Sequence, residues 1–144
     1  MNRRSLLVVT LPLLALLAGC GKEMGRIPFS APGTGTSTVT LQAGEVAFWT
    51  DIDAEYHNDS SLPYTVLLEQ GGAKVASATC NPLGPIHTKT SWVEINVGNK
   101  HSRSGMGKMG CSVSLAKGGP TTVKATLGPA KDITVKKADL VLKQ

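Results

Sequence analysis

Four carboxylates stand close together in this 144-residue chain: Asp51, Asp53, Glu55 and Asp59. We call them the acidic ladder. Calcium takes roughly six to eight oxygen ligands, which clustered carboxylates can supply, so the acidic ladder is a candidate calcium site. Alternate residues of a strand lie about 7 Å apart, so loop residues would have to complete the site. The alternative is an acidic face that is solvated or paired with lysines of neighbouring strands.

The two tryptophans, Trp49 and Trp92, form a second candidate site. Each is expected to face outward from its own strand. Aromatic side chains offer an apolar ring face and a polar handle, so two rings brought together could form a ligand-binding platform for a glycan. The alternatives are that loops cover the two rings or that they belong to a second apolar core.

Residues 98–110 form a basic, glycine-rich segment that we expect to be a loop. It contains three side chains of types that bind copper: His101, Met106 and Met109. It also contains three bases that could bind an anion beside accessible glycine amides: Lys100, Arg103 and Lys108. A surface loop without a ligand is the alternative to both sites.

Motifs of hydrolytic enzymes are missing from the sequence. The chain contains neither G-x-S-x-G nor H-E-x-x-H. Its histidines are His57, His87 and His101, and no pattern around them indicates a Ser-His-Asp triad. We therefore expect a protein that is not an enzyme and that has no catalytic residues. We expect no cofactor, with calcium at the acidic ladder as the alternative, and an envelope hydrolase is the alternative function.

The N-terminus has the organisation of a secretory signal peptide. Arg3 and Arg4 form a short positive region, and residues 6–17 form an apolar run. This run is too short to span a bilayer as a helix, which takes about 20 residues. We therefore expect residues 1–19 to be removed during secretion.

The end of the apolar run, Leu17-Ala18-Gly19-Cys20, resembles the lipobox of bacterial lipoproteins. The resemblance implies cleavage before Cys20 and diacylglycerol on its sulfur, usually with a third acyl chain such as palmitate on the new amine. Two or three acyl chains anchor a protein firmly in a membrane. In lipoproteins of this kind an Asp after the Cys retains the protein in the inner membrane, so the resemblance with Gly21 at this position favours the outer membrane if the host is Gram-negative. The alternative is an ordinary signal peptide with a chance cysteine.

The two remaining cysteines, Cys80 and Cys111, are expected to form a disulfide, because a secreted protein enters an oxidising compartment. A closed loop of this length contributes about 3.5 kcal/mol to stability by restricting the unfolded chain. A metal-binding or redox pair of thiols is the alternative, although such pairs usually show C-x-x-C spacing.

Charge is unevenly distributed along the chain. Residues 27–73 contain six acids and no Lys or Arg, whereas residues 74–144 contain eleven bases and three acids. This asymmetry predicts oppositely charged strands that lie side by side in one sheet. Scattered bases, few aromatic residues and a secreted location all argue against a nucleic-acid partner.

Residues 44–59 are predicted to form one long amphipathic strand, because apolar and polar side chains alternate along them. Phe48 and Ile52 are expected to be core residues. Asp51 and Asp53 are expected to be exposed or partnered by bases, because burying unpartnered acids is costly.

Seven further strands are predicted, at residues 38–42, 64–69, 73–80, 88–97, 111–116, 121–127 and 132–142. Gly71 and Gly72 make the second and third of these a β-hairpin, because glycine adopts the positive φ of tight turns. In residues 88–97, we expect Val93, Ile95 and Val97 to face the core. About eight short strands with no helical period indicate an all-β, antiparallel β-sandwich, either Ig-like or jelly-roll.

The expected organisation is a signal peptide at 1–19, a lipidated Cys20 with a flexible tether at 20–37, and a β-sandwich at 38–144. The tether is inferred from a segment rich in Gly, Pro, Ser and Thr, with a short edge strand around Ile27 and Phe29 as its alternative. The predicted function is a lipid-anchored envelope protein that binds a protein or glycan partner.

Overall fold

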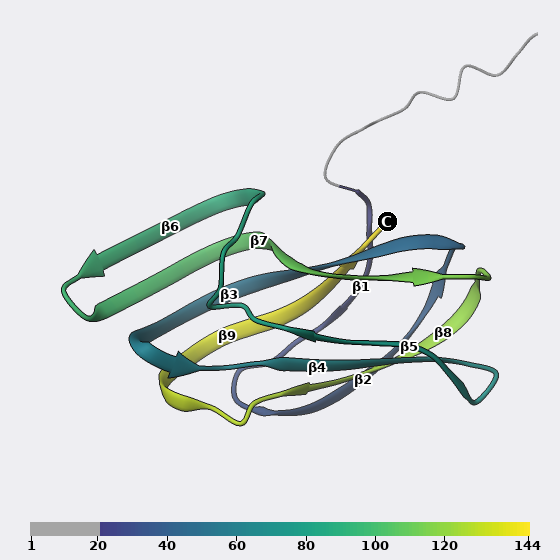
Figure 1. Cartoon of the computed structure of the whole chain (residues 1–144), viewed down its shortest axis with the longest axis horizontal. Helices are drawn as coiled ribbons and strands as arrows, with labels where there is room; N and C mark the ends of the chain where they lie inside the picture. The colour runs from purple at the N-terminus through teal and green to yellow at the C-terminus, as the bar shows by residue number, and fades with distance from the viewer. Residues whose placement is uncertain (1–20) are drawn as a thin grey trace, which may run out of the picture.

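The computed structural model describes residues 21–144, which form two antiparallel sheets packed face to face (Figure 1). The predicted signal peptide and Cys20 lie outside the described residues. The strands are β1 (Glu23–Ile27), β2 (Gly33–Leu41), β3 (Gly44–Ser61), β4 (Tyr64–Gln70), β5 (Ala73–Cys80), β6 (Lys89–Val97), β7 (Lys100–Leu115), β8 (Gly119–Leu127) and β9 (Lys131–Lys143). Across residues 21–144 there is no helix long and apolar enough to cross a membrane.

The larger sheet has the strand order β1-β9-β3-β7-β6, and the smaller sheet has the order β2-β8-β4-β5. Every neighbouring pair is antiparallel. The predicted antiparallel β-sandwich is therefore confirmed, with one strand more than expected. β3 lies at the centre of the larger sheet between β9 and β7, so its side chains set the two faces of that sheet.

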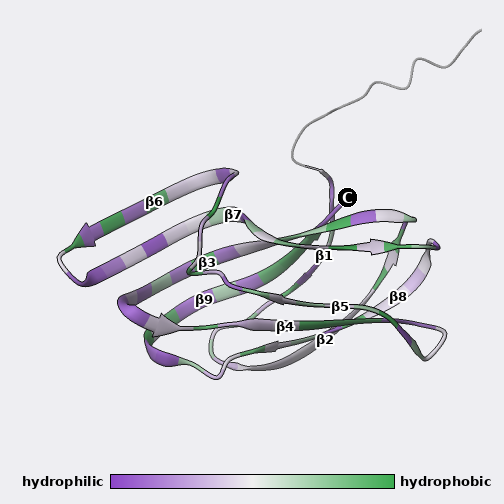
Figure 2. Cartoon of the chain, in the orientation of Figure 1, coloured by the Kyte–Doolittle hydropathy of each residue, from purple (hydrophilic) through white to green (hydrophobic). Residues whose placement is uncertain are grey.

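The two faces of β3 follow the alternation of its sequence. Phe48 and Ile52 are buried in the core between the sheets. Asp51 and Asp53, at odd-numbered positions, point away from that core, and Asp51 is paired with two bases. The predicted register of β3 is thus confirmed. Colouring by hydropathy shows the same alternation of hydrophobic and hydrophilic residues along the strands (Figure 2).

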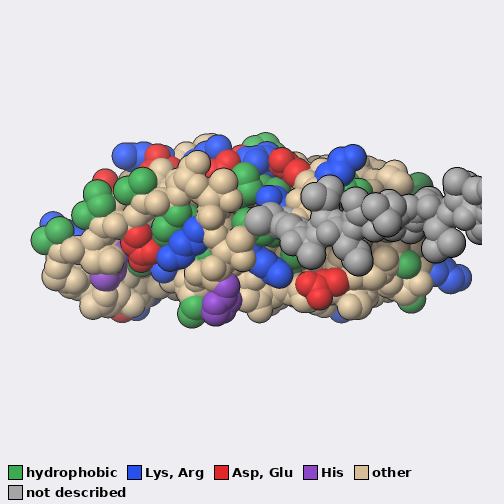
Figure 3. All heavy atoms as spheres, turned by 90° about the horizontal axis from the view of Figure 1, so that it is seen from above, with side chains coloured by type: hydrophobic (Ala, Val, Ile, Leu, Met, Phe, Trp, Pro, Cys, Tyr) green, Lys and Arg blue, Asp and Glu red, His purple; other side chains and the backbone are tan. Residues whose placement is uncertain are grey.

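The faces of β6 are the reverse of the prediction. Val93, Ile95 and Val97 are 56%, 57% and 72% exposed, whereas Trp92 packs partly buried against the core. Val93, Ile95 and Val97 lie on the face of the larger sheet that points away from the smaller sheet, and no second sheet within residues 21–144 covers that face. The β6–β7 hairpin also reaches beyond the smaller sheet (Figure 1). Hydrophobic side chains are visible on the surface at this end of the molecule (Figure 3). Alternation marks two faces of a strand, but it does not say which one is covered.

The glycine-rich segment 98–110 is not a loop, because β7 runs through most of it. Glycine serves here to let β6 pass close by. At Gly105, where φ is 131°, an added Cβ would lie 2.7 Å from the Cα of Trp92 and would also collide with the carbonyl oxygen of Ser91. β6 is bulged at that point. Glycine is the residue that permits such close backbone contact.

The predicted flexible tether at residues 20–37 is wrong over its described part. β1 pairs with β9, and each of the nine residues of β2 pairs with β8. Ile27 and Phe29 are buried, which supports the edge-strand alternative. An edge strand buries few of its residues, so it needs few large apolar side chains. The Gly, Ser and Thr residues of these strands therefore resemble a flexible linker in composition. Lys22 already exchanges two backbone hydrogen bonds with Gln144, of 2.7 and 3.1 Å, so strand-like pairing is present at the second described residue.

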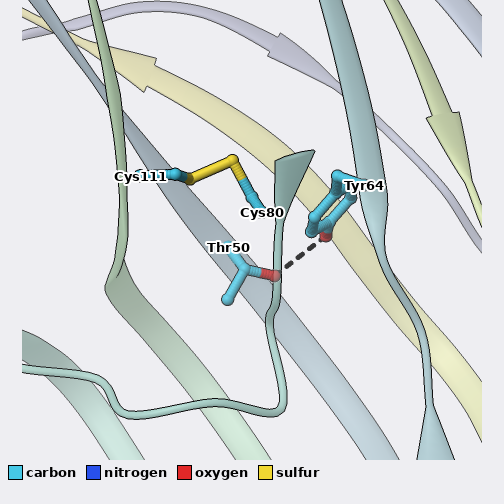
Figure 4. Close-up of a disulfide and its surroundings, with 4 residues drawn as sticks. All are labelled: Thr50, Tyr64, Cys80 and Cys111. Carbon is cyan, nitrogen blue, oxygen red and sulfur yellow. Dashed lines mark hydrogen bonds between the residues drawn. A yellow bond between two sulfur atoms is a disulfide. The ribbon is translucent and has the colours of Figure 1, made fainter. Parts of the chain in front are cut away.

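A disulfide and a hydrogen-bonded tyrosine join the two sheets through the core (Figure 4). The predicted disulfide is confirmed: Cys80 at the end of β5 is bonded to Cys111 on β7, with Cα atoms 5.6 Å apart. Beside it, the fully buried Tyr64 donates a hydrogen bond of 2.6 Å to the carbonyl oxygen of Ala138. The Thr50 hydroxyl donates to the Tyr64 oxygen at 2.9 Å. The pKa of Tyr64 is raised by burial, so it remains a neutral donor.

Candidate functional site

A groove of about 630 Å³ lies at the end of the larger sheet where β3, β6, β7 and β9 run side by side. The strand register places Ile95, Ser102, Glu55 and Thr134 in one row across these four strands. Alternate residues of a strand share a face, and Glu55 lies on the face of β3 that points away from the core. The floor of the groove is therefore the outer face of the larger sheet.

The lining of the groove combines hydrophobic and charged side chains. Ile95 and Val97 supply apolar surface on the β6 side. In the next row towards the end of the sheet, Lys100 pairs in register with His57, and Asp132 lies on the β9 side. The groove thus offers a cation, carboxylates, an imidazole and an apolar wall within one surface of ligand-binding size.

His101 and its partners hold the hairpin against β3 beneath the groove. The His101 ring is hydrogen-bonded to Asn96 on β6 and to Asn58 on β3. It also lies 5.2 Å from the Tyr56 ring, measured between ring centroids. These contacts tie three neighbouring strands together, so the groove has a fixed floor.

Arg103 supports the hairpin from the core side. Its guanidinium donates hydrogen bonds of 2.9 and 2.7 Å to the carbonyl oxygens of Pro82 and Gly84. It also lies 5.6 Å from the Trp92 ring centroid, and its Nε is 3.5 Å from a Glu94 carboxylate oxygen. Burial opposes ionisation of Glu94, but the hydrogen bond from Trp92 and the nearby positive charges of Arg103 and Lys89 outweigh it and lower the pKa of Glu94.

The acidic ladder does not assemble into the predicted calcium site. The Asp51 carboxylate is already bound by Arg26 at 2.7 Å and by Lys137 at 2.9 Å. Burial opposes its ionisation, yet these hydrogen bonds hold the pKa of Asp51 below its ordinary value. The same Arg26 Nη1 also binds Asp139 at 3.1 Å. Pairing with bases of neighbouring strands, the alternative to calcium, is therefore what the structure shows at Asp51.

The other acids of the ladder separate along β3. Glu55 lines the groove, and Asp59 is an exposed residue whose carboxylate lies 3.9 Å from Lys131. Nowhere in residues 21–144 do three His, Cys, Asp or Glu side chains come close enough to hold a metal ion. The spacing of about 7 Å between alternate residues explains this, because no loop supplies the missing ligands.

The predicted tryptophan platform is also wrong. Trp49 is only 1% exposed, and the Lys143 ammonium lies 4.0 Å from its ring centroid. Trp92 packs against the core, and Arg103 and Lys89 lie 5.6 and 5.7 Å from its ring centroid. The two rings thus lie on opposite faces of the larger sheet and cannot bind one glycan together.

The copper and anion arrangements proposed for residues 98–110 are not formed. Met109 is buried in the core and Arg103 beneath the groove, while His101 is held by two asparagines. Only Lys100 of this segment lines the groove as an exposed base.

Sequence reasoning missed the groove because its residues come from four strands. His57, Lys100 and Asp132 are unremarkable in sequence and become neighbours only through the register of β3, β7 and β9. One feature of the sequence could have indicated the groove: apolar residues at positions 93, 95 and 97, followed by a polar segment that pairs with them in a hairpin. No protein-family model matches this chain, and no curated protein matches it significantly.

Proposed function

We propose that this protein is a lipid-anchored, non-enzymatic binding protein of the bacterial cell envelope, and that the groove binds a segment of another envelope protein. The observation that carries the proposal is the groove itself, with its apolar wall of Ile95 and Val97 and its charged groups from β3, β7 and β9. Concave surfaces with an apolar lining and a few convergent polar groups are the usual form of binding sites.

A polypeptide fits this lining better than a glycan does. Glycan platforms use stacked aromatic rings, and both tryptophans are engaged elsewhere. A polypeptide offers apolar side chains for Ile95 and Val97, and amides and charges for Glu55, Lys100 and Asp132. Mixed surfaces of this kind are typical of protein interfaces with an apolar centre and a polar rim.

The lipid anchor is proposed from the lipobox, and the fold constrains where it would hold the domain. Lys22 is hydrogen-bonded to the C-terminal residue Gln144. Only Gly21 therefore stands between Cys20 and the paired residue Lys22, a reach of about 7 Å from Cys20 to Lys22. An anchored domain would lie directly at the membrane surface rather than on a long tether.

The groove lies away from the proposed anchor along the sheet. Lys143 pairs with both Glu23 and Ala47, so Ala47 is level with the start of β1. Glu55 lies eight residues further along β3, which is about 26 Å at the usual rise of a strand. The groove would therefore stay open to a partner while the acyl chains are in the membrane.

The lipid anchor is tested by substituting Cys20. A palmitate analogue fed to expressing cells should label the parent protein, and Cys20→Ala should abolish the label and leave an uncleaved or soluble protein. Equal labelling of parent and variant would remove the anchor from the proposal.

Binding at the groove is tested by capture from detergent-solubilised envelopes with the full-length protein. Lys100→Glu and Glu55→Lys each reverse a charge in the groove and should remove the same partner from the captured material. Lys117→Glu, an exposed lysine in the β7–β8 turn, is the matched control and should capture as the parent does. Capture that is unchanged by both groove variants, or binding to purified cell-wall glycan alone, would contradict a protein partner at this site.

A further inference from the structure

Within residues 21–144, β6 is an edge of the larger sheet with one side unpaired. It bonds to β7 on one side and is the last strand on the other. The hairpin turns through Gly98 and Asn99, and Val97 pairs with Lys100 across the turn. In a two-residue hairpin the pair that flanks the turn is hydrogen-bonded, and hydrogen-bonded pairs alternate with open ones. The backbone groups of Glu94 and Asn96 therefore point outward, free to pair with another strand.

The side chains of β6 do not block such pairing. Edge strands are commonly protected by charged residues or proline on the exposed face. The outer face of β6 instead carries Val93, Ile95 and Val97, each more than half exposed. The one acid in this stretch, Glu94, is on the other face and is engaged by Trp92 and Arg103. An exposed apolar edge of this kind favours addition of a strand.

The apolar residues are arranged symmetrically about Ile95. If two copies of β6 pair antiparallel with Ile95 opposite Ile95, Val93 of each copy lies opposite Val97 of the other. Glu94 then lies opposite Asn96, so no like charges face each other across the pair. In this register the two Ile95 residues form a non-hydrogen-bonded pair. The outward backbone groups of Glu94 in each copy then form hydrogen bonds with those of Asn96 in the other copy.

We propose that a second copy of this chain adds to β6, so that the two larger sheets join edge to edge through a two-fold axis at Ile95. The two-fold axis is perpendicular to the sheet, so both grooves open on the same side of the dimer. Val93 of the second copy extends the apolar wall that Ile95 and Val97 give to each groove. The self-matching register favours a second copy over an unrelated strand, because an isologous contact needs this symmetry.

The proposal goes beyond the proposed partner binding, and the two can fail separately. Where both copies are anchored in one membrane, confinement raises their effective concentration, so a short interface is sufficient. In a purified sample the same contact would be weaker, so the test is made in membranes.

Disulfide crosslinking tests the register directly. In an open antiparallel pair the Cα atoms lie about 4.5 Å apart, which is within the range that a disulfide spans. The full chain with Ile95→Cys should form a covalent dimer in oxidised membranes that disappears on reduction. Val75→Cys is the matched control, because Val75 is an exposed apolar residue on β5, the edge of the other sheet. A monomeric Ile95→Cys protein, or equal crosslinking of both variants, would overturn the proposal.

Substituting Ile95 with charged residues distinguishes a second copy of this chain from any other strand bound at β6. Ile95→Lys and Ile95→Glu should each lose the dimer, detected by amine crosslinking of membranes, because like charges then face each other at the axis. Coexpression of the two variants should restore a mixed dimer. Failure of the mixture to dimerise would overturn the two-fold register. Crosslinking of β6 to a different polypeptide in place of itself would overturn the second copy as its occupant.

Discussion

At the scale of single residues, Asp51 was predicted as a calcium ligand, but in the structure it forms ion pairs that link neighbouring strands. Its carboxylate accepts hydrogen bonds from Arg26 on β1 and Lys137 on β9. Asp51 therefore links β3 to its neighbour β9 and to the edge strand β1. The Asp51 side chain is only 21% exposed, so these hydrogen bonds are partly shielded from water. An ion pair of this kind contributes more than a fully exposed one.

Asp51→Asn should therefore lower the free energy of unfolding at neutral pH by about 1–2 kcal/mol, since hydrogen bonds to charged groups are the stronger class. Asp53→Asn is the control and should stay within about 0.5 kcal/mol of the parent, as surface changes usually do. Urea unfolding of the two variants measures both values. Equal costs for the two changes would show that the Arg26 and Lys137 contacts add no stability.

The lowered pKa of Asp51 also predicts how stability depends on pH. The folded pKa lies below the unfolded one, so the contribution of Asp51 is complete above the unfolded pKa of about 3.9. It is lost as the pH falls through the folded pKa, because the unfolded chain binds the proton first. The parent should therefore lose stability below about pH 4 more steeply than Asp51→Asn does. Identical slopes for the two proteins would contradict the assignment.

At the scale of elements, the sequence predicted the strands that carry a clear local signal, either an alternation of apolar and polar residues or a glycine turn. The alternation of β3 was read correctly because Phe48 and Ile52 face a sheet and Asp51 faces away from it. β4 and β5 were recognised from the glycine turn between them. These elements agree with their sequence because local pattern and tertiary packing favour the same structure.

Three edge strands, β1, β2 and β6, were misjudged from the sequence, whereas the edge strand β5 was predicted. β1 and β2 bury few large side chains, so their Gly, Ser and Thr residues resemble a linker in composition. The outer face of β6 has an apolar pattern but no sheet to cover it. Periodicity reports that a strand has two faces, whereas the position of a strand within its sheet depends on residues far away in sequence.

The close contact between β6 and β7 gives a test of the corrected element. Gly105→Ala should lower the free energy of unfolding by about 1–3 kcal/mol, because the new Cβ meets the β6 backbone and the positive φ becomes strained. In Gly110→Ala, on the same strand, no atom beyond the adjacent residues lies within 4 Å of the added Cβ, so this change should be close to neutral. Thermal unfolding of the two variants measures the difference. A neutral Gly105→Ala would show that β6 does not pack on β7 in this register.

At the scale of the whole molecule, the fold separates stability from binding. The disulfide, the Tyr64 hydrogen bonds and the core between the sheets hold the body of the sandwich. The β6–β7 hairpin extends past this body (Figure 1). Its outer face bears the exposed Val93, Ile95 and Val97, and together with β3 and β9 it lines the groove. The proposed lipid at Cys20 would hold the body at the membrane and leave the hairpin end accessible.

Crosslinking from inside the groove of the anchored protein tests the central claim most directly. A photoreactive phenylalanine analogue in place of Lys100, in the full chain in intact cells, should give a discrete covalent adduct with one other envelope protein on illumination. The same analogue in place of Lys117 should give no such adduct. Matching adducts from both positions, no adduct from Lys100, or an adduct made only of two copies of this chain would contradict the claim that the groove binds a protein partner.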